Sequence, residues 1–179
     1  MSAVAASMRL FFAAWPQAQA AARLARWGRE IADGTGGRVT RAETIHLTLA
    51  FLGDVAVTRG ADAVAAARRV EAPAHAFAIE EARYWAHNRI VWVGPRETPV
   101  SLGTLAEGLR SELEASGFAL ERRAFAAHVT LIRKARAPAA PLEPPAVQWP
   151  VREFVLVRSM PASEGASYEV LERFPLAGG

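Results

Sequence analysis

Short stretches in which apolar and polar residues alternate are separated along this chain by longer alanine-rich segments with helical spacing. Alternation is typical of strands that bury one face, and recurrence of apolar residues every three or four positions is typical of helices. Two of the helical segments end at a glycine, Gly34 and Gly117, as many helices do. Strands are predicted at residues 8–15, within 35–55, and at 76–85, 89–95, 126–133, 151–160 and 167–176; helices are predicted at 17–34, 58–72 and 100–117.

Helices and strands are interspersed along the whole chain, which indicates an α+β fold. In each half a helix precedes a histidine-containing strand, so we expect a diverged duplication. The proline-rich segment 135–150 is predicted to be a loop, because proline cannot donate to the ladder of a central strand. No composition shift marks a linker. We therefore predict one domain over residues 8–179, built of two lobes that share a core.

Composition narrows the class of protein. Half of the 179 residues are apolar, enough for a buried core, yet no apolar run approaches the length of a membrane span. The absence of cysteine excludes disulfides and thiolate chemistry. Net charge is +3, and Lys134 is the sole lysine among arginines, which favours bidentate recognition of phosphate or carboxylate. We expect a cytoplasmic monomer that does not bind membranes.

One motif, His-apolar-Thr-apolar, occurs twice, as "HLTL" from His46 and "HVTL" from His128. Alternate side chains of a strand share a face, so His46 and Thr48 should point one way and their apolar neighbours the other, and His128 should pair with Thr130 in the same manner. A single histidine in an apolar strand is most often a hydrogen-bonded core residue. Two matched motifs in one chain point instead to a shared function.

Two imidazoles that face each other across a cleft can divide the labour of a displacement at phosphorus. One removes a proton from the attacking water, and the other protonates the departing oxygen. Neighbouring threonine hydroxyls can donate hydrogen bonds to the non-bridging oxygens. Neither motif carries the third ligand that a catalytic zinc requires, and the chain has no nucleophile elbow, so we predict no metal, no cofactor and no serine hydrolase site.

The paired motifs resemble those of the 2H phosphoesterases, and the details are similar to the RNA 2′,3′-cyclic phosphodiesterase branch, also called the 2′-5′ RNA ligase or LigT-like family. The resemblance covers most of the chain: "MRLFFAAWP", "RVTRAETIHLTLAFLGDV", "NRIVWVG", the segment through "AFAAHVTLIRKAR", and "SYEVLERFPL". One departure is Ala127, where the family often has proline. The resemblance implies two pseudo-twofold-related antiparallel sheets with outer helices and a central active-site groove.

The resemblance also implies roles for the four motif residues. It casts His46 as the acid that protonates the leaving ribose oxygen and His128 as the base that activates water. Thr48 and Thr130 would hold the phosphate oxygens. Because a symmetric pair exchanges roles when the reaction runs backwards, the same site could join RNA ends through a 2′-5′ linkage.

Two further residues are implied by position, Phe51 as a stacking surface for a nucleobase and Arg133 as a phosphate contact. Each follows its motif histidine by five residues. Counted by twos, neither lies on the histidine face of a regular strand. We therefore expect each strand to end or bulge before these residues.

The other histidines, His75 and His87, lack a threonine partner and are predicted to be non-catalytic. The tryptophans are expected to pack in the core or between the lobes. Residues 1–7 have no counterpart in the family, and we expect them to be a disordered leader or to reflect an upstream start.

The sequence therefore predicts a metal-independent phosphodiesterase that opens RNA 2′,3′-cyclic phosphate ends to 2′-phosphates. Two alternatives stay open. One is a 2H enzyme that acts on a small cyclic nucleotide, and the other is an RNA-binding module without catalysis. Intact motifs in both halves favour catalysis, because a binding module needs positive charge and stacking rather than two titrating imidazoles.

Overall fold

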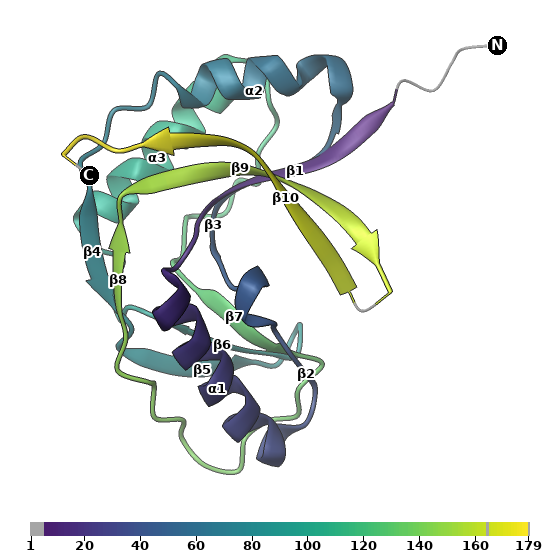
Figure 1. Cartoon of the computed structure of the whole chain (residues 1–179), viewed down its shortest axis with the longest axis vertical. Helices are drawn as coiled ribbons and strands as arrows, with labels where there is room; N and C mark the ends of the chain where they lie inside the picture. Colours follow the sequence, from purple (N-terminus) through teal and green to yellow (C-terminus); the bar gives the residue numbers. More distant parts are fainter. Residues whose placement is uncertain (1–5, 164, 179) are drawn as a thin grey trace.

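Two four-stranded antiparallel sheets form the upper and lower halves of the computed structural model, which describes residues 6–163 and 165–178 (Figure 1). The upper sheet has the strand order β10-β9-β1-β3, and the lower sheet has the order β2-β7-β6-β5. A two-stranded ribbon of β4 and β8 completes the strands. The strands are β1 (Ser7–Ala14), β2 (Arg38–Val39), β3 (Leu47–Ala56), β4 (His75–Ala78), β5 (Glu81–Trp85), β6 (Ile90–Gly94), β7 (Val129–Arg133), β8 (Gln148–Val151), β9 (Glu153–Ala162) and β10 (Gly165–Pro175).

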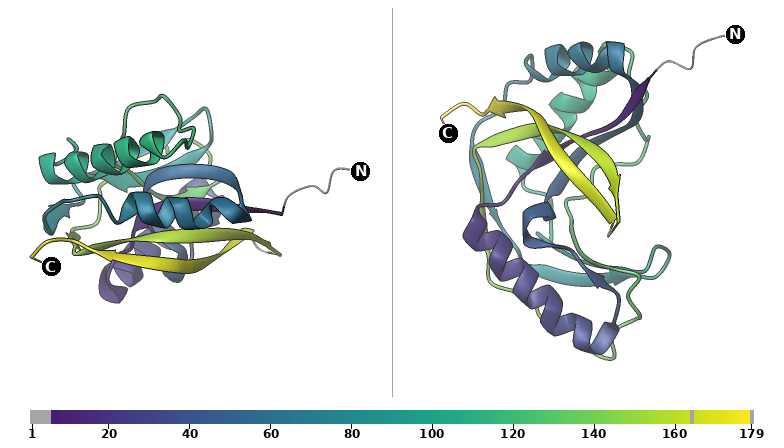
Figure 2. Two further views of the ribbon diagram at one scale, coloured as in Figure 1. Left: turned by 90° about the horizontal axis from the view of Figure 1, so that it is seen from above. Right: turned by 45° about the vertical axis from the view of Figure 1, so that its right-hand side comes forward.

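Each sheet is covered by a helix that follows a strand of the other sheet. Helix α1 (Ala18–Thr35) follows β1 of the upper sheet and contacts β2 and β7 of the lower one. Helix α3 (Val100–Ala115) follows β6 of the lower sheet and contacts β3 of the upper one, with α2 (Gly60–Ala67) packed against it (Figure 2). Because each helix follows a strand of one sheet and packs on the other, the two lobes are linked. The arrangement confirms the predicted α+β fold of two antiparallel sheets with outer helices.

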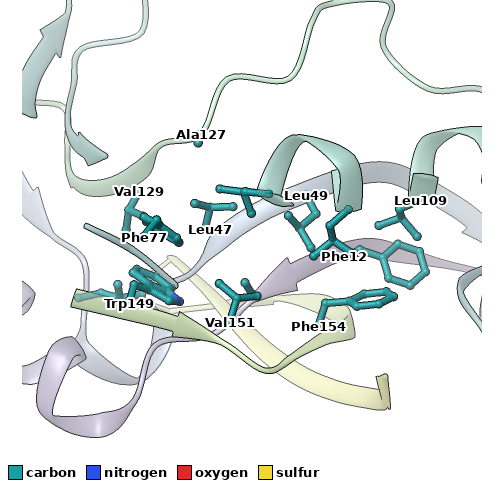
Figure 3. Packing of buried hydrophobic residues seen from close by; sticks show 14 of the residues in the cluster. Phe12, Leu47, Leu49, Phe77, Leu109, Ala127, Val129, Trp149, Val151 and Phe154 are labelled. Atoms are coloured by element: carbon teal, nitrogen blue, oxygen red, sulfur yellow. The ribbon is translucent and has the colours of Figure 1, made fainter. Parts of the chain in front are cut away.

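The apolar residues of the two motif strands are buried, as the alternation predicted. Leu47 and Leu49 of β3 and Val129 and Leu131 of β7 are at most 6% exposed. Figure 3 shows how side chains of β3 and β7 lie in one core with residues of the upper sheet and α3. Burying a leucine or valine side chain contributes about 1.5–3 kcal/mol. This burial holds one face of each motif strand inward, so the opposite face is left for the histidines and threonines.

Three local predictions were wrong or shifted. Residues 76–85 form two strands, β4 and β5, that belong to different sheets. The end of the proline-rich segment forms β8, which contains Pro150 and pairs only with β4, so it is not a central strand. The helix predicted to begin at residue 58 begins at Gly60, because residues 57–59 form a 3-10 turn that leads into α2.

The first strand begins close to the predicted start of the domain. Strand β1 begins at Ser7, one residue before the predicted start at Met8. Residues 1–5 of the predicted leader lie outside the described residues. None of the helices in the described ranges is both long and apolar enough to cross a membrane.

Candidate active site

His46 and His128 occupy equivalent places in the two lobes. Each is the residue immediately before its strand, β3 or β7, rather than within it. In each case Nδ1 lies 2.8 Å from the carbonyl oxygen two residues earlier in the chain, which belongs to Thr44 for His46 and to Ala126 for His128. A carbonyl oxygen only accepts, so Nδ1 donates in both rings. Each neutral imidazole therefore carries its lone pair on Nε2.

Both motif strands contain a bulge directly after the threonine. In β3, Thr48 and Ala50 pair with the consecutive residues Ala13 and Phe12 of β1, which leaves Leu49 as an extra residue. In β7, Thr130 and Ile132 pair with Trp92 and Val91 of β6, which leaves Leu131 as the extra residue. One extra residue reverses the alternation beyond it. The second residue after each bulge, Phe51 in β3 and Arg133 in β7, therefore shares the face of the motif threonine.

The shift brings Phe51 and Arg133 to the groove, as the expected bulges required. Phe51 pairs with Phe11 of β1, and the residue is 42% exposed. Arg133 is exposed at the end of β7. Both side chains line pockets that also contain motif residues. The structure thus places both sequence-predicted binding residues beside the histidines.

A pocket of about 640 Å³ holds both motifs. Both histidines and both threonines line it, and Arg133 and Tyr168 contribute to its walls. The two histidines come from sequence positions 82 residues apart, and the contact between β3 and β7 brings them together. A volume in this range is typical of pockets that bind a small ligand.

Aromatic rings surround both histidines, which the sequence reasoning missed. Trp15 stacks on His46 with ring centroids 5.0 Å apart and an interplanar angle of 18°. Phe11 and Tyr168 also contact His46, at 4.9 and 5.2 Å between centroids. Trp85 lies 4.7 Å from the His128 ring. The expectation that the tryptophans serve packing alone is therefore too narrow, and no local signal in the sequence connects positions 15 and 85 with the motifs.

These surroundings disfavour the charged form of both histidines. Burial lowers the pKa of His46 to about 4, because the imidazolium loses its hydration, and the charges of Arg133 and His128 add to the effect. Burial also lowers the pKa of His128, with further contributions from Arg123 and Arg133. The hydrogen bonds to the backbone carbonyls oppose both shifts. In the unliganded groove both rings are therefore predominantly neutral at pH 7.

The remaining histidines lie apart from this pocket. His75 is in β4, where Nδ1 lies 3.0 Å from the carbonyl oxygen of Pro73. The ring of His87 lies 5.9 Å from that of Trp85, and neither histidine lines a pocket that contains a motif residue. Across residues 6–163 and 165–178, no three or more His, Asp or Glu side chains form a group that could hold a metal ion.

Comparison with known proteins gives consistent matches. Residues 15–92 match the model of the family described as LigT like Phosphoesterase. The chain is 35% identical to the RNA 2′,3′-cyclic phosphodiesterase of Escherichia coli over 170 residues, which is 94% of this chain and 96% of that protein. It is 34% identical to the RNA 2′,3′-cyclic phosphodiesterase of Thermus thermophilus, with 96% of this chain and 91% of that protein covered.

Solved structures resemble most of the chain as well. The crystal structure of E. coli LigT complexed with 3′-AMP matches with a TM-score of 0.88 and 33% identity, covering 96% of this chain and 99% of that one. The MHV ns2 PDE domain matches with a TM-score of 0.62, covering 84% of this chain and 99% of that one. Its sequence is only 12% identical, so that match shows a shared fold and nothing more.

Proposed function

The chain belongs to the LigT-like phosphoesterase family, and from this we propose that it hydrolyses 2′,3′-cyclic phosphate ends of RNA to 2′-phosphomonoesters. The observation that carries the proposal is the single pocket in which two equivalent histidines and two threonines meet. Relatives that match nearly the full length of this chain are named RNA 2′,3′-cyclic phosphodiesterase. Both the site and the relatives therefore support the same reaction.

In the proposed reaction His128 acts as the base and His46 as the acid. Nε2 of His128 accepts a proton from water as the water oxygen bonds to phosphorus. The bond between phosphorus and O3′ breaks, and Nε2 of a protonated His46 gives its proton to O3′. The products are a 2′-phosphomonoester and a 3′-hydroxyl. The bonds from Nδ1 to the backbone carbonyls orient both rings so that Nε2 can take part.

Thr48 and Thr130 are proposed to bind the non-bridging phosphate oxygens. Both hydroxyl-bearing side chains are half-buried and line the same pocket as the histidines. Negative charge grows on these oxygens as water attacks, so a fixed donor stabilises the transition state more than the ground state. Removal of one such donor typically costs two to three orders of magnitude, ~10²–10³, in turnover.

The acid role of His46 requires that substrate binding raise its pKa. With a pKa of about 4 in the empty groove, the ring is neutral at pH 7. A phosphodiester carries a full negative charge, and an opposite charge at close range favours imidazolium. The substrate is therefore proposed to recruit the proton that His46 gives to O3′.

Phe51 and Arg133 are proposed to bind the RNA end itself. An exposed ring such as that of Phe51 can stack on any nucleobase, which gives binding without strong sequence preference. The guanidinium of Arg133 is close enough to lower the pKa of both histidines by its charge, so it also lies close to where the phosphate must sit.

A panel of substrates tests the proposal. Purified protein would be offered RNAs with 2′,3′-cyclic ends and small cyclic phosphates, all in EDTA, and the products would be resolved as 2′- or 3′-phosphates. We expect 2′-phosphate to form from the RNAs in the presence of the chelator. Activity that is lost in EDTA and restored by a divalent ion would contradict the proposal, and turnover of small cyclic nucleotides alone would assign the site to that substrate class.

A further inference from the structure

A second pocket extends from the motif site along the upper sheet. Its volume is about 790 Å³, and His46, Thr48 and Arg133 line both this pocket and the motif site. Four arginines, each from a different strand, contribute to it: Arg9 of β1, Arg38 of β2, Arg133 of β7 and Arg158 of β9. Arg158 lies 3.9 Å from the carboxylate of Glu169, so its charge is partly compensated within the protein. Asp54 is the acidic residue among those that line it. We refer to this space as the arginine pocket.

Two of these arginines stand directly opposite each other. Arg38 and Arg133 are cross-strand partners in the β2–β7 pair. Like charges placed directly opposite each other destabilise a sheet, and a bound anion would relieve this repulsion. None of the carboxylates in the described part of the chain lies at salt-bridge distance from Arg9, Arg38 or Arg133. The charges of Arg38 and Arg133 are therefore available to a ligand. Arg9, whose cross-strand partner is Asp54, makes no ion pair with it that would withdraw its guanidinium from the pocket.

The arginines are held at defined places around the pocket. The Arg9 guanidinium lies over the Phe51 ring, 5.1 Å from its centroid. Arg38 lies against the start of β10, where a Cβ added to Gly165 would come within 3.4 Å of its Cζ. Gly165 has φ +114, a conformation that suits glycine, and this lets β10 approach Arg38 closely. The pocket thus presents positive charge from strands of both sheets.

In another branch of the groove, by contrast, arginines are paired with carboxylates of the protein. This branch, of about 570 Å³, runs from His128 toward α3 and is also lined by arginines. There Arg110 is paired with Glu114 at 3.1 Å, and Arg123 with Glu121 at 3.2 Å. Its charges are largely compensated within the protein, so the arginine pocket is the stronger site for a second anion.

We infer that the arginine pocket binds the phosphodiester that joins the reacting nucleotide to its neighbour on the 5′ side. The inference rests on the proposed function, because the cyclic phosphate must occupy the motif site. A 2′,3′-cyclic phosphate terminates its strand, so the next anionic group of the substrate can lie only on the 5′ side. Arg9 and Arg38 therefore make the enzyme select ends of RNA strands over isolated nucleoside cyclic phosphates.

Three matched substrates test this inference. The first is a nucleoside 2′,3′-cyclic phosphate with a free 5′-hydroxyl, and the second is the dinucleotide that adds one phosphodiester on the 5′ side. The third is the same dinucleotide with an uncharged methylphosphonate at that linkage. We expect the wild-type protein to prefer the charged dinucleotide about 3- to 30-fold in kcat/KM over either of the others, as befits exposed charge-assisted contacts.

The variants Arg9→Gln and Arg38→Gln should lower this preference toward unity. Arg29→Gln is the matched control, because Arg29 is an exposed arginine of α1 that lies outside the pocket linings described above, and it should keep the wild-type preference. The preference is a ratio of two rates on one preparation, so a partly unfolded variant does not distort it.

Two outcomes would overturn the inference. One is an equal rate for the charged and the methylphosphonate dinucleotides with the wild-type protein. The other is a wild-type preference that persists in both Arg9→Gln and Arg38→Gln. Failure of the wild-type protein to open any of the three substrates would contradict the proposed function instead, so the two failures can be told apart.

Discussion

Leu49 and Leu131 are equivalent residues of the two lobes, each being the extra residue of a bulge that directly follows a His-x-Thr motif. Both leucines are buried, so the bulges are anchored in the core. Because each bulge reverses the alternation, Phe51 and Arg133 reach the same groove as the motif threonines. The two equivalent bulges thus place a further side chain beside each of the two equivalent His-x-Thr motifs.

The charge of Arg133 should be measurable at both histidines. We predict that Arg133→Gln raises the pKa of His46 and of His128 in the free protein, because the arginine charge lowers both. Titration of the imidazole signals by NMR would measure the shifts, and Arg29→Gln would control for net charge. Unchanged pKa values for both rings would mean that the Arg133 side chain points away from the groove.

The pH optimum of kcat/KM should differ from the pH optimum of kcat. One histidine must be neutral and the other charged, so each profile should be bell-shaped. The profile of kcat/KM reports the free protein, in which both pKa values are lowered, and its optimum should fall below the ordinary histidine pKa of 6.5. The profile of kcat reports the complex, in which the bound anion raises both values, so its optimum should lie at higher pH. Coincident optima would contradict recruitment of the proton by the substrate.

Burial of His46 should also appear in the stability of the fold. Its pKa is about 4 in the folded protein and near 6.5 when unfolded, so the unfolded chain binds more protons between these values. The stability contributed by the neutral ring is present above pH 6.5 and lost as the pH falls toward 4. Between about pH 7 and pH 4 the wild-type protein should lose on the order of 3 kcal/mol of unfolding free energy through His46, and we predict that His46→Asn removes this part of the loss. Urea unfolding at both pH values would measure it, and identical losses in the two proteins would refute the assignment.

The two threonines should contribute to turnover more than to binding. Thr48→Val and Thr130→Val each keep the shape of the side chain and remove the hydroxyl, so we predict losses of about 10- to 1,000-fold in kcat. Substrate affinity should change far less. Near-normal kcat with a raised Kd in both variants would indicate that the hydroxyls bind the ground state only.

Much of this arrangement could be predicted from the sequence because it depends on local pattern. The alternation around His46 and His128 determines which residues turn toward the core, and the odd spacing to Phe51 and Arg133 already required each strand to end or bulge. The strand pairing of residues 76–85 could not be predicted, because a segment that reads as one strand forms two, in different sheets. The stacking of Trp15 on His46 could not be predicted from the sequence either, because it depends on how β1 pairs with β3.

The roles of the histidines can be separated by the choice of leaving group. A substrate in which sulfur replaces O3′ departs as a thiolate and needs no proton. We predict that this substrate restores much of the activity lost in His46→Ala and little of that lost in His128→Ala. Rescue of His128→Ala instead would exchange the acid and base roles while leaving the two-histidine reaction in place.

The central claim is that two histidines act together in one displacement, and the single-turnover rate on an RNA with a 2′,3′-cyclic end tests it most directly. We predict that His46→Ala and His128→Ala each lose about 10²- to 10⁴-fold in this rate, with far smaller changes in affinity, and that the double variant is little worse than either single one. A rate near that of the wild type in either single variant would contradict the two-histidine account.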